Sequence, residues 1–375
     1  MNRPDSNDYR SILLSGLPMV DLRAPCEFAQ GSFPNTVNLP LMDDEERRKV
    51  GTCYKQYGQD AAIRLGHKLV SGPLREERIR AWKAFVAAHP EGYIFCFRGG
   101  LRSRTVKQWL TEEGASYPLI VGGYKAMRRF LIDTLDQCAE ALPQVILGGL
   151  TGSNKTGFVA RHPCGLNLEG FANHRGSSFG SFPTPQPTQI AFENQLAVAC
   201  LRQEAMQHRY LLLEDEGRII GSLNIPLKLH ESMKYAPLVV LQEKFEQRVE
   251  NILDEYVTGM YGLYVDEAQR YGMGSEESVF GVYSEWLLSA MDKLRKRLGG
   301  ERHRDLRQKM EAALAEQSGS GQVNLHREWI TPLLEDYYDP MYRYQLNQKK
   351  ERVIFEGSTS EVQEFLSSYR QETQG

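Results

Sequence analysis

The sequence has no long apolar run. Its 375 residues include no apolar stretch of the ~18 residues that a membrane-spanning helix needs. Residues 1–6 also lack the apolar core of a secretory signal peptide. We therefore expect no membrane partner and a cytoplasmic protein. Internal repeats and low-complexity segments are absent as well, so the length predicts two or three ordinary domains.

Cysteine is scarce, and so is any excess of charge of one sign. The six cysteines are widely spaced and form no C-x-x-C pair, which argues against a zinc cluster or a disulfide framework and favours a reducing compartment. The formal net charge is −3 at pH 7, so an RNA site would have to be a local basic patch. With 41% hydrophobic and 25% charged residues, the composition is otherwise typical of globular proteins.

Short apolar runs alternate with helical patterns in the first part of the chain. Such alternation is typical of a parallel sheet covered by helices. The expected strands lie at 18–22, 93–96 and 117–121, and the expected helices at 42–49, 75–88, 103–113 and 124–141.

A second alternating series starts at residue 144. Its strands are expected at 144–148, 210–214 and 236–241. A loop rich in Gly, Ser and Pro spans 165–190, and loops of that length are usually functional. The predicted fold class is therefore α/β with two domains, 1–140 and 141–375, the second ending in a helical region from about 243 to 375.

One cysteine lies in a loop suited to a reactive thiol. Cys96 follows an apolar strand and is followed by two glycines, Gly99 and Gly100, and two arginines, Arg98 and Arg102. The glycines let backbone N–H groups turn toward one point, and the arginines add positive potential. Together these features lower a thiol pKa and bind an anion. The alternative is a buried structural cysteine followed by a glycine turn.

A second loop follows the strand expected at 144–148. Residues 149–156 nearly match the phosphate-binding pattern G-x-x-x-x-G-K-[ST], with Asn154 in place of the second glycine. Asparagine tolerates left-handed backbone better than most residues, so the loop could bind phosphate without being a competent ATPase. A chance strand–turn–helix is the alternative. The predicted phosphate-binding residues are Gly149, Gly152, Ser153, Asn154, Lys155 and Thr156.

Three acidic residues end the strand expected at 210–214. Glu214 and Asp215 are placed where a phosphate-loop domain would hold Mg²⁺ through water, although three consecutive acids are equally typical of a solvated turn. Arg218 follows closely and could reach an anion. No metal site is certain from the sequence.

The motifs together resemble a known family. Residues 20–23 (VDLR), the Cys96 loop and residues 122–125 (GGYK) are similar to a rhodanese domain, and the 149–156 loop is similar to that of a P-loop NTPase-like domain. This unusual pairing resembles the bacterial tRNA 2-selenouridine synthase family. Further matching stretches are VGTCYKQ at 50–56, LEG at 168–170, NHRGS at 173–177, FG at 179–180, PQP at 185–187, FEN at 192–194 and YDPMY at 338–342. The family loop is expected to have glycine where this chain has Asn154.

The resemblance implies an activity. Such enzymes act on tRNA that carries 2-thiouridine at the wobble position, and they replace its sulfur with selenium from selenophosphate. They also transfer a geranyl group from geranyl diphosphate to that sulfur, and the S-geranylated base is the expected intermediate. The resemblance implies no tightly bound cofactor, and Mg²⁺ could accompany the diphosphate.

The resemblance also suggests roles for individual residues. The 149–156 loop would grip the diphosphate, Cys96 would carry or position the selenium, and Arg98 and Arg102 would neutralise selenophosphate. His174 and Arg175 would meet the diphosphate or the RNA, with a solvated loop as the alternative. Cys53 is either a relay for a perselenide or a small buried residue. The remaining cysteines, Cys26, Cys138, Cys164 and Cys200, are expected to serve packing.

A basic segment offers a surface for RNA. Eight basic and three acidic side chains leave a net charge of +5 over residues 292–309, which suits contact with RNA phosphates or is simply a solvated face. The candidate RNA-contacting residues are Lys293, Arg295, Lys296, Arg297, Arg302 and Arg304, followed by Arg307 and Lys309. Four tyrosines, Tyr337, Tyr338, Tyr342 and Tyr344, either stack on a splayed base or belong to the core.

Two other functions remain open from the sequence. One is a rhodanese sulfurtransferase fused to an ATP-dependent kinase, which predicts nucleotide hydrolysis; Asn154 argues against it. The other is a non-catalytic module that binds tRNA or phosphate, which predicts that Cys96 is dispensable. The intact loop around Cys96 argues against that module.

Overall fold

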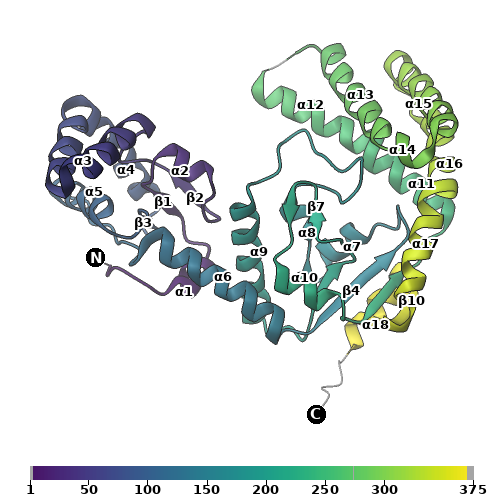
Figure 1. Ribbon diagram of the computed structural model, residues 1–375, viewed down its shortest axis with the longest axis horizontal. Helices are drawn as coiled ribbons and strands as arrows, with labels where there is room; N and C mark the ends of the chain where they lie inside the picture. Colours follow the sequence, from purple (N-terminus) through teal and green to yellow (C-terminus); the bar gives the residue numbers. More distant parts are fainter. Residues whose placement is uncertain (1–2, 273, 370–375) are drawn as a thin grey trace. The chain divides into compact units, whose positions relative to one another are not determined.

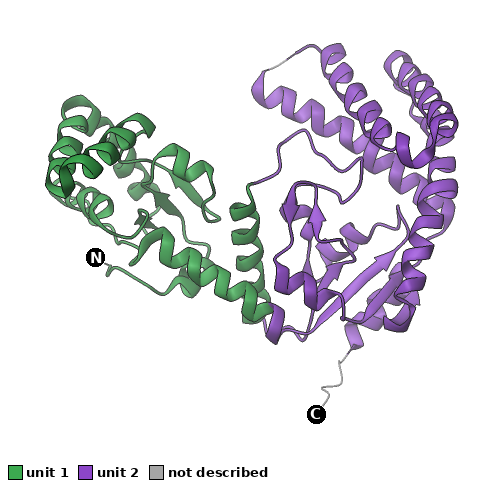
Figure 2. Cartoon of the chain, viewed as in Figure 1, with its two compact units in different colours: residues 1–138, 188–205 green, residues 139–187, 206–375 purple. Residues whose placement is uncertain are grey.

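The computed structural model describes residues 3–272 and 274–369. The chain forms two compact units, shown in different colours in Figure 2. Unit 1 comprises residues 1–138 and 188–205, and unit 2 comprises residues 139–187 and 206–375. The sequence placed all residues after 141 in the second domain, whereas the helix at 188–205 packs with unit 1. The buried Asn194 shows why, because its amide donates to the Ser32 carbonyl at 2.8 Å.

Unit 1 is built on a parallel sheet of three short strands in the order β2-β1-β3. The stretch expected as a strand at 117–121 forms only isolated parallel bridges, Ile94 to Leu119 and Ser6 to Ile120. The elements of unit 1 (Figure 1) are α1 Tyr9–Leu14, β1 Met19–Asp21, α2 Pro25–Ala29, β2 Thr36–Asn38, α3 Asp44–Leu69, α4 Gly72–Ala88, β3 Tyr93–Phe95, α5 Leu101–Glu112, α6 Gly123–Ala141, which ends in unit 2, and α9 Gln189–Ala205.

Helix α3 is much longer than the helix expected at 42–49. Asp43 caps its start, because its carboxylate accepts from the Glu46 N–H at 2.7 Å while Glu46 accepts from the Asp43 N–H at 2.8 Å. Gly58 interrupts the helix with a φ of 80°, a conformation that glycine adopts without strain. The sequence suggested only the first turns because the break at Gly58 obscures the helical pattern.

Unit 2 is built on a five-stranded, fully parallel sheet in the order β10-β9-β4-β6-β5. The central strand β4 is buried along its whole length, as expected for a strand covered on both faces. The strands and small helices of unit 2 are β4 Gln144–Gly149, α7 Lys155–Arg161, β5 Gly165–Leu166, α8 Leu168–Ala172, β6 Leu211–Glu214, β7 Ile219–Ile220, β8 Leu223–Asn224, α10 Leu227–Met233 and β9 Leu238–Leu241.

The rest of unit 2 is mostly helical, but it is not all helix. Strand β10 pairs in parallel with β9 at the sheet edge, so the region expected to be helical at about 243–375 also contributes one strand to the sheet. The elements are α11 Phe245–Ile252, η1 Leu253–Thr258, α12 Gly259–Tyr271, α13 Glu276–Lys293, α14 Arg295–Leu298, α15 Gly300–Ser320, η2 Asn324–His326, α16 Arg327–Leu333, η3 Leu334–Tyr338, α17 Asp339–Gln348, η4 Lys350–Arg352, β10 Val353–Gly357 and α18 Thr359–Ser368.

The burial of the cysteines agrees only in part with their expected role in packing. Cys138 and Cys200 are buried, as expected for packing, but Cys26 is exposed, because its short helix α2 buries no side chain. Cys53 and Cys164 are partly buried. Within the described ranges, no helix combines the length and the apolar character needed to cross a bilayer.

Candidate functional site

The loop after β3 places Cys96 at the carboxyl end of a strand, as predicted. Cys96 is buried, and its Sγ lies 3.2 Å from the Ser103 hydroxyl, which in turn donates to the Gly100 carbonyl at 3.1 Å. Glycine at 123 is required here, because a Cβ atom on it would lie 2.3 Å from the Cys96 carbonyl oxygen. The glycine pair at 122–123 thus packs directly on the backbone of the Cys96 loop.

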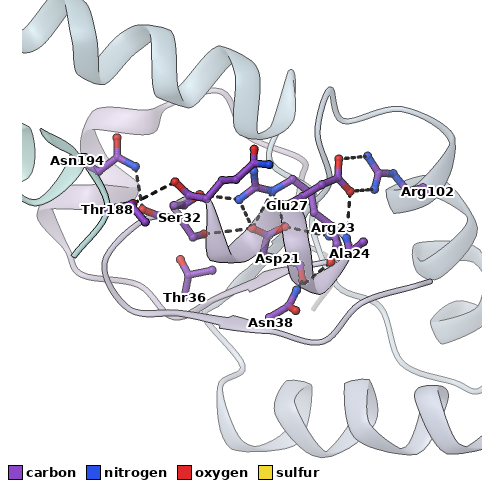
Figure 3. A network of polar contacts seen from close by, with 12 residues as sticks. Asp21, Arg23, Ala24, Glu27, Ser32, Thr36, Asn38, Arg102, Thr188 and Asn194 are labelled. Carbon is purple, nitrogen blue, oxygen red and sulfur yellow. Dashed lines mark hydrogen bonds and ion pairs between the residues drawn. The ribbon is translucent and has the colours of Figure 1, made fainter. Parts of the chain in front are cut away.

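The two arginines of this loop are in different environments. Arg98 is exposed. Arg102 donates to the Glu27 carboxylate at 2.7 Å, so its charge is already balanced within unit 1 (Figure 3). The prediction that Arg102 neutralises an anion must therefore include Glu27 as a competing partner.

Glu27 belongs to a wider polar network at the end of β1 (Figure 3). Asp21 and Arg23 form a buried ion pair at 2.6 Å, and Arg23 also donates to the Gly31 carbonyl at 2.9 Å. The Arg23 guanidinium lies 3.6 Å from the ring centroid of Tyr124, next to the glycine pair that packs on the Cys96 loop. The network thus fixes the VDLR segment against the same loop.

In unit 2, the 149–156 loop joins the buried strand β4 to helix α7, as the sequence predicted. Asn154 has a φ of 59° and a ψ of 36°, so it adopts the left-handed conformation for which the motif has glycine. Gly157, three residues later, leaves space for the Asn154 side chain, because a Cβ atom on Gly157 would lie 2.1 Å from Oδ1 of Asn154. The hydroxyl of Ser153 is turned away from solvent and donates to the Leu150 carbonyl at 2.8 Å.

Two side chains of helix α11 donate hydrogen bonds to backbone carbonyls of this loop. Arg248 donates to the Thr151 carbonyl at 3.1 Å, and Asn251 donates to the Gly152 carbonyl at 2.7 Å. Arg248 is itself buried and forms a two-point ion pair with Asp339, with distances of 2.7 and 2.6 Å. A Cβ atom on Gly152 would lie 2.7 Å from the Arg248 carbonyl oxygen, so the close approach of helix and loop requires glycine.

A cavity of about 300 Å³ opens beside the loop, at the carboxyl ends of β4 and β6. Gly152, Asn154, Lys155 and Thr156 all line it. The Lys155 ammonium donates to the carbonyls of Gly149 and Leu150 at 2.9 and 3.1 Å. Burial lowers the pKa of Lys155, and the surrounding carboxylates, Glu169 foremost, oppose that shift.

Several carboxylates line the same cavity. The Thr156 hydroxyl donates to Glu169 at 2.6 Å. Burial, with the Glu169 charge next, raises the pKa of Glu214 to about 8, and the same causes raise the pKa of Glu216 to about 9. Asp215 also lines the cavity, but it is paired with Lys349 at 2.7 Å.

Among the described residues, no three His, Cys, Asp or Glu side chains stand close enough to hold a metal, so the cavity carboxylates alone do not make a complete Mg²⁺ site. Mg²⁺ usually binds through one or two carboxylates and the phosphates of its substrate. Glu214 fits that requirement, because one of its oxygens, Oε1, is buried without a hydrogen-bond partner in the described structure.

Of the two residues predicted from the NHRGS stretch, only Arg175 lines the cavity among the described residues. Arg175 lines the cavity, where its guanidinium lies 4.9 Å from the Tyr256 ring centroid and 4.7 Å from that of Phe182. Its Nη1 atom is buried and has no hydrogen-bond partner in the described structure. His174 and the exposed Arg218 are not among the described residues that line this cavity. Burial lowers the pKa of His174.

The basic segment forms the end of α13, the short α14 and the start of α15. All six residues named as RNA candidates, Lys293, Arg295, Lys296, Arg297, Arg302 and Arg304, are exposed. Arg307 and Lys309 are less exposed and pair with acids, Arg307 with Asp292 at 3.1 Å and Lys309 with Asp305 at 2.8 Å.

The four tyrosines of the 337–344 segment differ in how deeply they are buried. Tyr338 is buried and Tyr342 partly buried, and both line the unit 2 cavity, whereas Tyr344 is exposed. Burial raises the pKa of Tyr342 to about 12. Tyr337 is partly buried and receives a hydrogen bond from Arg297 at 3.4 Å.

Sequence reasoning missed several residues of the cavity. Glu169 brings a carboxylate, and Glu255, Tyr256 and Trp329 come from helices of the second half of the chain. Glu169 and Phe179 lie in stretches that carried the family resemblance. Asp339, which forms the ion pair with Arg248, lies in another of these stretches. Those stretches were the available signal, but no spacing rule connects them to the 149–156 loop.

The fold and the site define a class. Unit 2 is an α/β domain with a cavity lined by charged side chains, which come from the glycine-rich loop after a buried parallel strand and from a neighbouring strand end. Residues 142–373 match the family model described as the tRNA 2-selenouridine synthase AAA domain. The chain belongs to the tRNA 2-selenouridine synthase family, and it is an enzyme.

Curated relatives support the assignment over nearly the whole chain. The tRNA 2-selenouridine synthase of Pseudomonas syringae pv. tomato (strain ATCC BAA-871 / DC3000) is 51% identical, covering 97% of this chain and 98% of the relative. That of Pseudomonas fluorescens (strain Pf0-1) is 53% identical, covering 96% and 97%. A solved N-terminal domain of a Clostridium difficile 630 protein, described as binding ATP or GTP, is 30% identical over 31% of this chain, but its TM-score of 0.28 supports no argument.

Proposed function

We propose that this enzyme converts 2-thiouridine at the wobble position of tRNA into 2-selenouridine through an S-geranylated intermediate. Geranyl diphosphate and selenophosphate are the substrates. In this proposal unit 1 is a rhodanese-like domain that handles selenium, and unit 2 is a P-loop-like domain that handles the diphosphate. Membership of the tRNA 2-selenouridine synthase family supports the overall conversion.

One observation carries the first half of the proposal. Lys155 and Arg175 line one small cavity, and the buried Nη1 atom of Arg175 has no hydrogen-bond partner in the described structure. A buried guanidinium nitrogen with an unused donor is costly unless a ligand satisfies it. A diphosphate supplies both the negative charge and the acceptor oxygens.

In the proposed geranyl transfer, the groups that line the cavity have the following roles. The thiouridine sulfur attacks C1 of the geranyl chain, the C1–O bond breaks, and the diphosphate leaves with the bonding electrons. Lys155 and Arg175 stabilise the charge that develops on that leaving group. Mg²⁺, when bound, would neutralise further charge, and Glu214 and the Thr156 hydroxyl are the residues that would hold it.

The selenation step is assigned to the Cys96 loop. Alkylation makes the sulfur a better leaving group. The selenium of selenophosphate attacks C2 of the base, the C2–S bond breaks and geranyl thiol departs after protonation, and water then cleaves the Se–P bond and releases phosphate. Cys96 positions the selenophosphate, and the exposed Arg98 neutralises it together with the loop N–H groups of Gly99 and Gly100. The exposed basic residues from Lys293 to Arg304 hold the tRNA backbone.

The test is mass spectrometry of tRNA nucleosides. Purified protein is incubated with 2-thiouridine tRNA and with geranyl diphosphate and selenophosphate, separately and together. Lys155→Ala is expected to lose geranylation, whereas Cys96→Ala keeps the geranylated base and loses selenation. Arg161→Ala, an exposed charge on the same helix as Lys155, is the control and should behave as wild type.

Two outcomes would overturn the proposal. An unchanged base under all conditions would exclude it and, with ATP hydrolysis, would favour the sulfurtransferase–kinase alternative. Full selenation by Cys96→Ala would remove the assigned role of the Cys96 loop.

A further inference from the structure

We propose that the apolar part of the unit 2 cavity formed by α16 and η3, referred to below as its apolar end, binds the prenyl chain, and that Ile330, Leu333 and Leu334 limit its length. This inference rests on the proposed function, because it takes geranyl diphosphate as the ligand whose diphosphate lies at Lys155. It adds a second subsite and a determinant of specificity.

The cavity has both charged and apolar linings. Most of its charged side chains come from the loops after β4 and β6 and from the 167–177 segment, with Glu255 from η1. Of its aliphatic side chains, Ile330, Leu333 and Leu334 come from α16 and η3, and Ile252 comes from α11, next to Gly152. Ring contacts connect the 149–156 loop with η3. The Lys155 ammonium lies 5.8 Å from the Tyr342 centroid, and Tyr342 lies 6.4 Å from Tyr338.

The ring contacts continue on the apolar side. Tyr256 lies 6.1 Å from Phe179, and Phe179 stacks on Trp329 at 5.9 Å. Arg175 contacts both the charged and the apolar lining, because its guanidinium lies against the Tyr256 ring while its Nη1 atom has no hydrogen-bond partner in the described structure. A ligand with an anionic head and an apolar tail matches this order of side chains.

The apolar end does not suit a nucleobase. Ile330, Leu333 and Leu334 carry no hydrogen-bonding groups and are almost completely buried. The one polar atom of the Trp329 ring, Nε1, is already used, because it donates to His326 Nδ1 at 2.9 Å. A base placed against this wall would leave its polar edge unpaired, which is unfavourable, whereas a hydrocarbon chain loses nothing.

The part of the cavity lined by Trp329, Ile330, Leu333 and Leu334 is held rigidly as well as being apolar. Trp329 is held by its hydrogen bond to the buried His326 and by its stack on Phe179. The cavity volume of about 300 Å³ is at the lower end of the range of about 300–1,000 Å³ typical of ligand cavities. A rigid wall in a small cavity accepts chains up to a fixed length and rejects longer ones.

The experiment compares dimethylallyl, geranyl and farnesyl diphosphates with the full-length protein and a 2-thiouridine anticodon stem-loop. Leu333→Trp fills the apolar end, so kcat/KM for geranyl diphosphate should fall roughly 10–200-fold while that for dimethylallyl diphosphate changes little. Leu333→Ala enlarges it, so the ratio of farnesyl to geranyl transfer should rise at least about tenfold. Ile330→Phe gives a second filling variant if Leu333→Trp does not fold.

The matched control is Leu314→Ala. Leu314 is buried in the same hydrophobic cluster as Leu333, but it is not among the described residues that line the cavity. It should lose stability like Leu333→Ala and keep the wild-type preference for chain length. A wild-type enzyme that geranylates, with preferences unmoved by the Leu333 and Ile330 variants, would overturn the prenyl subsite and leave the proposed function intact.

Thermal protection by ligands separates the remaining outcomes. Geranyl diphosphate should raise the unfolding temperature of the wild type more than inorganic diphosphate does, and Leu333→Trp should remove that difference. Stronger protection by ATP than by geranyl diphosphate would show that a nucleobase occupies the apolar end, which overturns the subsite. Failure of the wild type to geranylate any substrate would overturn both the subsite and the proposed function.

Discussion

At the scale of single residues, Asn154 and Gly157 act as a pair. Asn154 takes the left-handed conformation of a motif glycine, and its Oδ1 occupies the space where a Cβ atom on Gly157 would lie. In an ordinary helix interior, glycine is about 0.5–1 kcal/mol less favourable than alanine. The glycine at 157 is therefore explained by the asparagine at 154.

This pairing predicts a change of sign in a double-mutant cycle. Gly157→Ala alone should destabilise the protein by up to about 1 kcal/mol, because the exposed Asn154 side chain must leave its rotamer to avoid the new methyl group. In an Asn154→Gly background the same change should stabilise it by up to about 1 kcal/mol. Urea unfolding of the wild type, both single variants and the double variant measures the coupling. Equal effects of Gly157→Ala in both backgrounds would show that the two residues are independent.

Glu214 predicts how stability depends on pH. Its pKa is raised to about 8 in the folded protein, mainly by burial, whereas the unfolded chain releases that proton near the usual value of about 4.3. Between those values the folded state holds a proton that the unfolded state lacks. The free energy of unfolding therefore falls as pH rises from about 5 to about 8. Glu216, whose pKa is raised to about 9, acts in the same direction.

Glu214→Gln tests this dependence. The variant should match the wild type near pH 5 and exceed its stability by about 1–3 kcal/mol at pH 9, because the amide carries no charge to bury. Thermal unfolding across that range is the measurement, with about 2–4 °C expected per kcal/mol. Glu361→Gln, at an exposed helix cap whose pKa is lowered, is the control and should not reproduce the gain at pH 9. A wild-type stability that rises from pH 5 to pH 8 would contradict the prediction.

The single residues show what a sequence reveals about a site. Lys155, Thr156 and the tolerance of Asn154 followed from a local motif, because consecutive residues share one loop whatever surrounds it. The partner of Arg102 did not, since Glu27 is 75 residues away in the chain. Glu169 and Trp329 escaped for the same reason, because contacts between distant segments are set by packing rather than by spacing.

At the scale of elements, two helices hold the 149–156 loop through one buried ion pair. Arg248 on α11 and Asp339 at the start of α17 are almost completely buried, and Arg248 also donates to the Thr151 carbonyl. Removing one partner of a buried ion pair leaves an uncompensated charge. The pair therefore couples the stability of the helical region to the shape of the loop.

Asp339→Asn measures that coupling. We expect a loss of about 3–5 kcal/mol in the free energy of unfolding, because Arg248 keeps its charge without its partner. Affinity for inorganic diphosphate should also fall, since the Thr151 carbonyl loses its anchor. The control is Arg327→Ala, which removes a more exposed pair with Glu250 and should cost no more than about 1 kcal/mol. A comparable cost for both variants would mean that burial of the Arg248 pair is unimportant.

Two π-helical segments also belong to this scale. η1 supplies Glu255 and Tyr256 to the cavity, and η3 supplies Leu334 and Tyr338. A π turn adds a residue to a helical turn and is frequently found at functional sites. The sequence predicted a helical region across both segments but not the π turns, because a pattern of apolar residues does not distinguish a π turn from an α turn.

The strands illustrate the same limit. The buried runs at 144–148 and 210–214 were predicted as β4 and β6 because parallel strands buried on both faces are continuous apolar stretches. Strand β10 at the sheet edge alternates between half-buried and exposed positions and was missed. Central strands are thus visible in the sequence, and edge strands are much less so.

At the scale of the whole molecule, neither unit is a single continuous segment. The chain passes between them at 138–139, 187–188 and 205–206. Helix α9 returns to unit 1 after part of unit 2 has been built, and Arg128 of unit 1 binds its Asn194 at 2.8 Å. A cut at the boundary predicted from sequence, near residue 140, would therefore remove a helix that unit 1 needs.

The basic surface of α13 to α15 carries the last prediction, which concerns the proposed tRNA. Lys296, Arg295 and Arg304 are exposed, so replacing all three by alanine should change the charge with little effect on folding. If they contact phosphates, affinity for tRNA should fall, and the slope of log affinity against log salt should decrease by about 2–3. Arg307→Ala/Lys309→Ala is the matched control, because both residues already pair with acids. Fluorescence anisotropy over a salt series measures both slopes, and an equal loss in the two variants would show that only the overall charge matters.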